Sequence, residues 1–207
     1  MLHERFQQVD KAQLARRFGA AARHYDAHAR FQQEVGQALL ELMPDGQVGS
    51  ELTVCGLDLG CGTGFFLPAL AGRCQQLHGL DLAPGMLAQA ALRGSGARLV
   101  CGDAEALPFA EQSLDWVFSS LALQWCADFS AVLSEARRVL RPGGVLAFAS
   151  LCVGTLYELR ESWQAVDGQV HVNRFRELET YRQLCAGSDL QVVSLQNQPH
   201  VLHYPQV

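Results

Sequence analysis

Apolar positions between residues 12 and 43 form two helical stripes, made of Leu14, Phe18, Ala21 and Tyr25 and then of Val35, Leu39 and Leu42. Their spacing of three and four residues predicts two helices with a break near residues 26–29. Because these helices precede the first predicted strand, they must pack on the sheet or cover its ligand edge. Tyr25 suits that edge, since its ring is apolar and its hydroxyl polar. An ordinary half-buried aromatic is the alternative.

Short apolar runs then alternate with helical segments along the rest of the chain. The pattern predicts five strands at 53–59, 76–82, 98–102, 114–119 and 145–150, and a further extended strand at 190–204. Helices are predicted at 65–72, from Pro84 onward, at 131–140 and at 156–166. Strands and helices in this alternation predict an α/β fold with a doubly wound, mostly parallel sheet and right-handed crossovers.

The length of 207 residues favours a single domain, residues 1–207. Within it we expect an N-terminal helical cap (1–43), a ligand-binding core (52–150) and a segment on the other side of the ligand (151–207). The last segment contains the predicted helix at 156–166, a loop around residues 171–175 and the predicted strand at 190–204.

Composition narrows the class of protein. Hydrophobic residues make up 49% of the chain and charged residues 18%, without an apolar run of the roughly 18 residues that a membrane span needs. The first residues lack the apolar core of an export signal, so we expect a cytoplasmic protein that does not bind membranes. A net charge of −5 disfavours nucleic-acid binding. Seven cysteines, without a C-x-x-C pair, indicate neither a disulfide framework nor a metal site.

The stretch Thr53–Gly64, TVCGLDLGCGTG, contains the clearest candidate chemistry. It predicts a strand that ends near Asp58, then a tight turn with Gly60, Gly62 and Gly64, then the start of a helix. Alternate glycines allow positive φ and let a ligand approach the main chain. The spacing G-x-G-x-G differs from the G-x-G-x-x-G of dinucleotide folds, which disfavours a dehydrogenase. Cys61 is interpreted as a turn residue that faces the ligand, because no base that could activate its thiol is apparent.

An acidic residue two positions before G-x-G-x-G resembles motif I of class I S-adenosylmethionine-dependent methyltransferases. Asp81 follows Gly64 by 17 residues, at the end of the second predicted strand, where an acid binds ribose hydroxyls. Asp103, after the third strand, is placed to accept a hydrogen bond from an adenine amino group; a helix N-cap is the alternative. Met86 is placed to pack on the purine, or else to fill the core.

Longer matches make the resemblance more specific. The chain resembles the malonyl-acyl-carrier-protein O-methyltransferases of biotin synthesis, the BioC family, over nearly its whole length. The similar stretches are FGAAARHYDAHARFQQEVGQALL, LDLGCGTG, GLDLAPGML, GDAEALPF, SLALQWC, EARRVLRPGG and AVDGQVHVNRF. The class I motifs identify only the superfamily, whereas SLALQWC and VDGQVHVNRF indicate the subfamily.

The resemblance implies a seven-stranded class I fold with a Rossmann-like sheet. It also implies methyl transfer from S-adenosylmethionine, with S-adenosylhomocysteine as product and without a metal, to the carboxylate of malonyl-acyl carrier protein or malonyl-CoA. Relatives of this type continue past Tyr204, so we expect this chain to lack the final helix and strand. The expected cofactor-binding residues are Asp58, Gly60, Cys61, Gly62, Asp81, Leu82, Met86, Asp103, Ala104 and Leu121.

Substrate-side candidates come from the two subfamily stretches. Gln124, Trp125 and Asn173 are expected to bind substrate. An ionised malonyl carboxylate needs no general base, so the expected task is positioning. Arg174 is predicted to anchor that carboxylate, with Tyr25 and His171 as helpers, although an arginine that braces a loop is the alternative. The candidates for an acidic carrier-protein patch are Arg137, Arg138, Arg141, Arg160 and Arg176.

Three other interpretations stay open at this point. A quinone C-methyltransferase would share the glycine motif but would need a base, for which His171 is the nearest candidate. A protein that binds the cofactor without catalysis is the second interpretation. A glycine-rich turn in an unrelated α/β protein is the third.

Overall fold

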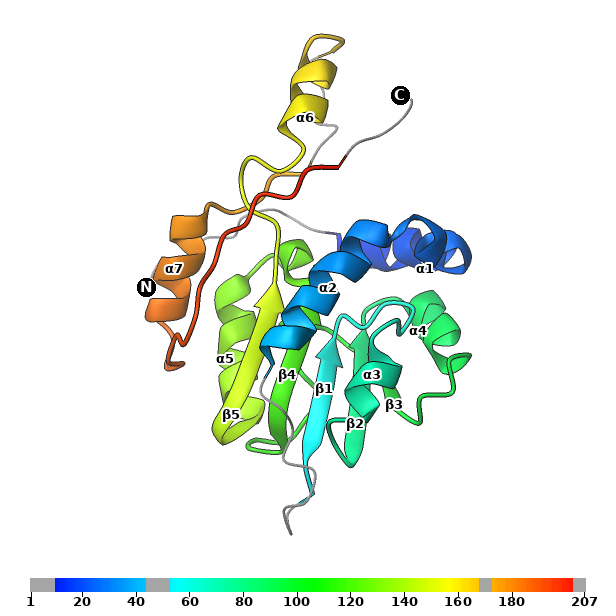
Figure 1. Cartoon of the computed structure of the whole chain (residues 1–207), viewed down its shortest axis with the longest axis vertical. Coiled ribbons are helices and arrows are strands. Elements are labelled where there is room, and N and C mark those ends of the chain that lie inside the picture. Colours follow the sequence, from blue (N-terminus) through cyan, green and yellow to red (C-terminus); the bar gives the residue numbers. More distant parts are fainter. Residues whose placement is uncertain (1–9, 44–52, 168–172, 203–207) are drawn as a thin grey trace.

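Five parallel strands form the centre of the molecule in a computed structural model, which describes residues 10–43, 53–167 and 173–202 (Figure 1). Their order in the sheet is β3-β2-β1-β4-β5. The strands are β1 (Cys55–Leu59), β2 (Gln76–Asp81), β3 (Arg98–Cys101), β4 (Leu114–Ser120) and β5 (Leu140–Ala149). The chain adds β2 and β3 on one side of β1 and then returns to add β4 on the other. The order in which strands are added therefore reverses between β1 and β4. Open α/β sheets bind ligands at this point.

Helices cover both faces of this sheet and bury two separate cores. The helices are α1 (Lys11–His28), α2 (Arg30–Leu42), α3 (Leu67–Ala71), α4 (Pro84–Ala91), α5 (Phe129–Val139), α6 (Tyr157–Gln164) and α7 (Leu178–Ala186), with a short 3₁₀ turn at Leu123–Trp125. One core joins α2, α3 and α4 to the sheet through residues such as Leu40, Leu67 and Ala90. The other joins α5 and α7 through residues such as Val132 and Tyr181. Both cores include strand residues, so each strand is held from two sides.

Helix α1 and the start of α2 lie at the carboxyl ends of the strands, and the rest of α2 runs over one face of the sheet (Figure 1). They meet at Ala29, within the range predicted for the break. Glycines allow α1 to approach α4 closely, because a Cβ added at Gly85 would lie 2.7 Å from the Gly19 Cα atom. Behind this contact Ala22, Ala83 and Met86 form a small buried cluster. The prediction that these helices cover the ligand edge is confirmed.

The structure differs from the sequence expectations mainly after β5. Residues 191–202 are extended but form no strand in the described structure, and the predicted residues 203 and 204 lie outside it. Their valines stay exposed, 93% in the case of Val193, so nothing holds them to a sheet edge. The described residues form five strands of the seven-stranded fold that the resemblance implied, of which the final strand was not expected in this chain. Helix α7 was not expected, although Leu178, Tyr181 and Cys185 have helical spacing and the last two are buried.

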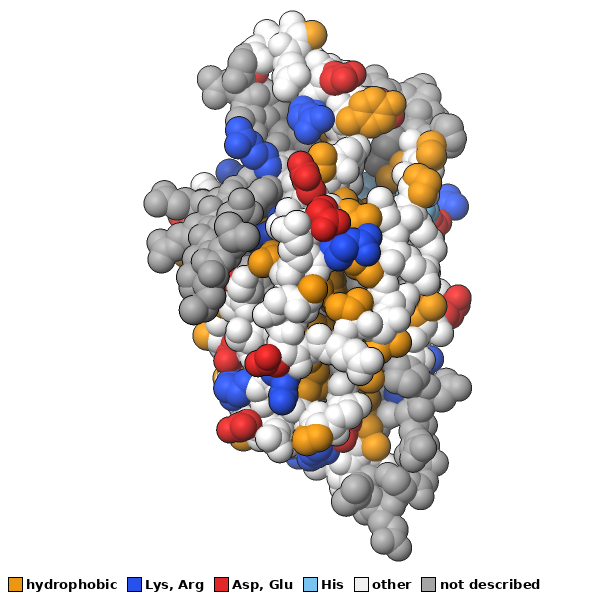
Figure 2. Space-filling view, turned by 90° about the vertical axis from the view of Figure 1, so that its left-hand side faces the viewer, with side chains coloured by type: hydrophobic (Ala, Val, Ile, Leu, Met, Phe, Trp, Pro, Cys, Tyr) orange, Lys and Arg blue, Asp and Glu red, His pale blue; other side chains and the backbone are white. Residues whose placement is uncertain are grey.

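The segment after β5 differs from the rest of the chain. Helix α6 has no buried residue and stands away from the sheet (Figure 1). Figure 2 shows exposed apolar side chains on the upper part of the molecule, where α6 lies. They include Leu156, Tyr157, Leu159 and Trp163. Of the helices in the described ranges, none combines the length and apolar character that crossing a bilayer requires.

Candidate active site

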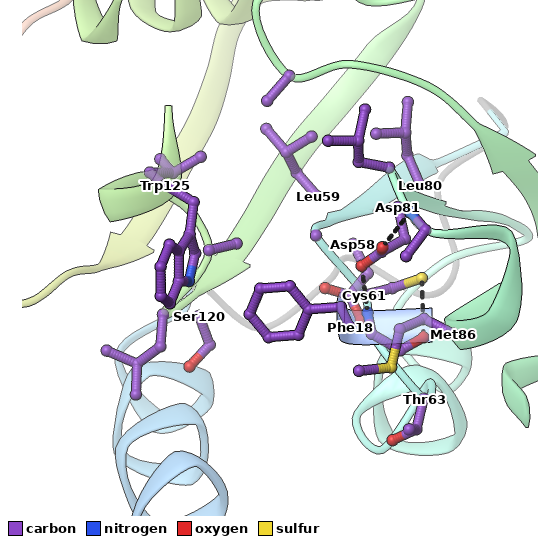
Figure 3. A pocket seen from close by; sticks show the side chains of 18 of the residues that line it. Phe18, Asp58, Leu59, Cys61, Thr63, Leu80, Asp81, Met86, Ser120 and Trp125 are labelled. Carbon is purple, nitrogen blue, oxygen red and sulfur yellow. Dashed lines mark hydrogen bonds between the residues drawn. The ribbon is translucent and has the colours of Figure 1, made fainter. Parts of the chain in front are cut away.

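A cavity opens at the carboxyl ends of β1, β2 and β4, under α1 and the start of α2 (Figure 3). Its wall includes all ten residues that the sequence placed around the cofactor, and also Tyr25 and Trp125. These positions come from five separate stretches of the chain. The fold therefore brings the predicted motifs to one place.

The glycine turn forms one wall of the cavity. Gly60, Gly62 and Gly64 have φ values of +75°, +55° and +76°. A Cβ at Gly60 would lie 2.2 Å from the Ala122 Cβ atom, so the turn can pass the segment just after β4 only without a side chain there. At Gly62 nothing lies within 4 Å of an added Cβ, which leaves that main chain open to a ligand. The Gly60 and Cys61 N–H groups donate to the Leu80 carbonyl at 2.7 and 2.9 Å and so fix the turn on β2.

Two carboxylates, the buried Asp58 and the half-buried Asp81, lie behind the turn. Asp58 is 3% exposed, and its Oδ2 atom has no hydrogen-bond partner among the described residues. Burial, and after it the charge of Asp81, raises the pKa of Asp58 to about 8. Asp81 accepts hydrogen bonds from the Gly62 and Ala83 N–H groups at 2.9 and 2.8 Å. Burial raises the pKa of Asp81 despite these bonds. A cationic ligand would stabilise the ionised form of both carboxyl groups.

Asp103 lies at the far end of the cavity and is held by a residue that the sequence did not indicate. The Lys11 Nζ atom lies 2.5 Å from Asp103 Oδ2 and 2.9 Å from Glu105 Oε2. Burial lowers the pKa of Lys11, but its bonds to the two carboxylates outweigh burial and raise it overall. No helix begins at Asp103 in the described structure, so the N-cap alternative is wrong. Instead, Asp103 Oδ1 accepts the Glu105 N–H in a turn.

Helix α1 closes the cavity with aromatic side chains. The Phe18 ring meets Trp125 edge to face, with centroids 5.4 Å apart. In the view of Figure 3 it lies between Trp125 and the buried carboxylates. Burial raises the pKa of Tyr25, with smaller effects from Asp81 and Asp26, so its hydroxyl keeps its proton at neutral pH. The sequence pointed to Tyr25 but not to Phe18, although both belong to the same apolar stripe.

The carboxyl end of α1 is tied to the glycine turn. The Thr63 hydroxyl donates to Asp26 Oδ1 at 2.6 Å, and Arg93 forms an ion pair with the same carboxylate. Arg93 also donates to the Thr63 carbonyl at 2.7 Å. These contacts join residues 30 to 67 positions apart, which no local pattern reveals. The covering helix is therefore fastened to the cofactor loops at both of its ends.

The substrate-side predictions are placed less uniformly. Trp125 lines the cavity, as does Leu121 of the predicted cofactor set, which has a φ of +51°. Gln124 does not line it; its Nε2 donates to the Leu121 carbonyl at 2.6 Å and so supports that unusual backbone. Asn173 and Arg174 are exposed and lie outside the cavity wall. His171 falls outside the described residues, so its predicted role stays a prediction.

The predicted carrier-protein patch is wrong for Arg176. This arginine is 3% exposed, and its guanidinium donates to the carbonyls of Cys126 and Ala127 at 3.0 and 3.1 Å. It braces the loop after the 3₁₀ turn. Arg138 and Arg141 are ion-paired with Glu135 and Asp115, respectively.

The charges of the cavity wall indicate what it can hold. Five carboxylates line it, Asp26, Asp58, Asp81, Asp103 and Glu105, and Lys11 is the one basic residue among the described lining residues. A ligand with a sulfonium and an ammonium group fits this set of carboxylates, whereas the negative charge of a pyrophosphate would be repelled by them. The described residues contain no cluster of three His, Cys, Asp or Glu side chains arranged to hold a metal ion.

Comparisons with known proteins agree with this geometry. Residues 57–148 match a family model described as a methyltransferase domain. A chain from the solved complex of the Haloferax volcanii Trm112 methyltransferase activator with a methyltransferase aligns with a TM-score of 0.65 and 26% identity, covering 81% of this chain and 73% of that one. The DhpI–SAH complex aligns with a TM-score of 0.64 and 22% identity, covering 87% of this chain and 88% of that one. The fold is that of class I S-adenosylmethionine-dependent methyltransferases.

Relatives among curated proteins are more specific. The malonyl-[acyl-carrier protein] O-methyltransferase of Serratia marcescens is 42% identical over 96% of this chain and 75% of its own length. The protein of that name from Yersinia pestis is 44% identical over 86% of this chain and 64% of its own length. The bifunctional protein BioHC of Cellvibrio japonicus is 48% identical over 81% of this chain, which spans 33% of that longer protein. The chain belongs to the malonyl-[acyl-carrier protein] O-methyltransferase family.

Proposed function

We propose that this chain binds S-adenosylmethionine in the cavity and methylates the free carboxylate of a malonyl thioester on acyl carrier protein, as a step of biotin synthesis. The observation that supports the cofactor is the acid-rich cavity at the β1/β4 reversal, with an unbonded carboxylate oxygen on Asp58. The printed name of the relatives, at 42–44% identity, supports the acceptor.

Each of the main cavity residues would bind a different part of the cofactor. Asp58 would pair with the ammonium group, because its carboxylate is buried without a hydrogen-bond partner for Oδ2. Asp81 would accept the ribose hydroxyls, since each of its oxygens holds one backbone N–H and keeps a free lone pair. Asp103 would accept from the adenine amino group, and Met86 would pack on the purine face. The open main chain at Gly62 lets the ligand lie against the turn.

The acceptor needs alignment and dehydration more than proton transfer. When bound, the cofactor supplies a methyl group that passes to a carboxylate oxygen, while the carbon–sulfur electron pair stays on sulfur. The malonyl carboxylate is ionised at neutral pH, so no side chain has to remove a proton. Alignment of two reactants in a closed site contributes on the order of 7–11 kcal/mol to lowering the barrier. The rings of Phe18 and Trp125 exclude water from this side of the cavity.

The direct test is incubation of the chain with methyl-labelled S-adenosylmethionine and malonyl-acyl carrier protein. We expect label in a methyl ester that alkali releases. Asp81→Asn serves as a weakened variant, because it keeps the size of the side chain and removes the charge. Asp115→Asn is the matched control, since Asp115 lies outside the cavity wall and pairs with Arg141.

Other outcomes separate the competing functions. Label that resists alkali and appears only with a quinone acceptor would indicate carbon methylation. Tight binding of S-adenosylhomocysteine without label on any malonyl thioester would indicate a binding protein that does not catalyse. Either result would refute the proposed reaction and leave the cofactor assignment intact.

A further inference from the structure

Two buried polar atoms on the α2 side of the cavity have no hydrogen-bond partner among the described residues. They are Gln32 Oε1 and Ser120 Oγ, and both residues line the cavity. We propose that Gln32 and Ser120 form the seat of the acceptor's carboxylate, so that neutral hydrogen-bond donors bind it. This inference rests on the proposed function and names the side chains that recognise its substrate.

A shielded polar atom without a partner lowers stability, so proteins rarely leave one without a use. Both atoms here are shielded from solvent and find no hydrogen-bond partner among the described residues. The Ser120 hydroxyl can donate to a carboxylate directly. The Gln32 amide can donate through its NH₂ group, because a half-turn of the amide exchanges oxygen and nitrogen in the same place. A bound carboxylate would satisfy both side chains at once.

The backbone brings these two side chains to adjoining parts of the wall. Gln32 and Gly36 are one helical turn apart on α2 and therefore share a face. A Cβ at Gly36 would lie 3.0 Å from Ser120 Oγ and 2.2 Å from the Phe66 ring. The missing side chain thus lets α2 lie directly on the end of β4. In Figure 3 Ser120 lies on the Trp125 side of Phe18, whereas Asp58 and Met86 lie on the other.

Charge gives the reason for neutral donors. Lys11, the basic residue of the described wall, already holds Asp103 and Glu105. Arg174 is exposed and outside the wall. A carboxylate is therefore best placed away from the acidic end, beside apolar rings and hydroxyl or amide donors. Neutral donors also leave the oxygen nucleophilic, whereas a tight cationic pair would stabilise the ground state more than the transition state.

The experiment measures binding by calorimetry to the full chain saturated with S-adenosylhomocysteine, so that it does not depend on turnover. The probe is malonyl-CoA, and acetyl-CoA is the ligand control because it lacks only the carboxylate. We expect Ser120→Ala and Gln32→Glu each to lower the affinity for malonyl-CoA at least tenfold and to leave the affinity for acetyl-CoA unchanged. Gln37→Glu is the matched control on the same helix, since Gln37 is exposed and bonded to Glu41; it should bind as wild type does.

Affinity for S-adenosylhomocysteine, measured first, should stay within twofold of wild type in all three variants. A parallel loss of this affinity would show that the two side chains serve the cofactor and would overturn the inference. Unchanged malonyl-CoA affinity, or a wild-type chain that prefers acetyl-CoA, would overturn it too. Gln32→Leu provides a second, uncharged variant in case Gln32→Glu fails to fold. Wild-type protein that binds malonyl-CoA selectively but forms no methyl ester would refute the proposed reaction alone.

Discussion

The residues from β1 to β5 and the residues after β5 are built in different ways. The first region packs strands and helices into two buried cores, and its side chains at the strand ends meet in one cavity. The second contains α6, which buries no residue, and the segment 191–202, which forms no strand. The cavity is thus built at the strand ends of the first region, whereas the second region is attached to the core mainly through α7 and Arg176. The contrast predicts that substitutions in the two regions have effects on stability and binding that differ in size and in kind.

The largest effect is expected in the core. Leu133→Ala removes a 2% exposed side chain from α5 and should lower the free energy of unfolding by about 2–5 kcal/mol. Urea denaturation measures this change. A loss below about 1 kcal/mol would mean that the α5 face is looser than described and would weaken the contrast.

Gly60→Ala should lower the free energy of unfolding slightly less, by about 2–4 kcal/mol. The substitution combines backbone strain at a positive φ with a clash against Ala122. Gly94→Ala is the matched control: its φ is +63°, but nothing lies within 4 Å of the added Cβ, so only the strain remains. Adding Ala122→Gly to Gly60→Ala should restore part of the loss. Additive effects in the double-mutant cycle would contradict the contact.

Asp58→Asn should separate binding from stability. Loss of the buried charge should weaken S-adenosylhomocysteine about 30- to 1,000-fold, as expected for removing one partner of a buried ion pair. Without ligand the variant should be more stable than wild type at pH 8. The reason is that Asp58, with a folded-state pKa of about 8 against 3.8, makes the wild type less stable as pH rises from about 4 to 8. Equal stability at pH 4 and pH 8 in both proteins would contradict this.

The same group predicts a pH dependence of binding. Since the ligand's ammonium favours ionised Asp58, binding should release its proton, and affinity should rise by up to about tenfold per unit from pH 6 to pH 8. Calorimetry in buffers of different ionisation enthalpy measures the released proton. Asp58→Asn should abolish the slope; a slope that persists in the variant would assign it to another group.

The smallest effect is expected on α6. Leu159→Ala, at a side chain that is 44% exposed, should change the free energy of unfolding by less than about 0.5 kcal/mol. If it destabilised the protein as much as Leu133→Ala, α6 would belong to the folded core and the contrast between the two regions would fail.

Sequence reasoning succeeded where a motif is local and failed where partners are distant. Asp58 and Asp81 lie in the last residues of their strands and Asp103 just follows one. Because parallel strand ends meet at one edge, their meeting in the cavity could be predicted. Lys11 and Asp26 could not be found in this way, because their partners lie 92 and 37 residues away. The segment 190–204 has strand-like composition, but the described structure offers it no sheet edge, so composition alone misled.

The contact between Gly60 and Ala122 also restricts how this protein can change over generations. The two positions are separated by 62 residues, yet a side chain at one requires a smaller side chain at the other. A random library that varies the glycine turn alone would therefore return mostly inactive clones. A side chain at position 60 should therefore be accepted more readily once Ala122, just beyond β4, has been replaced by glycine.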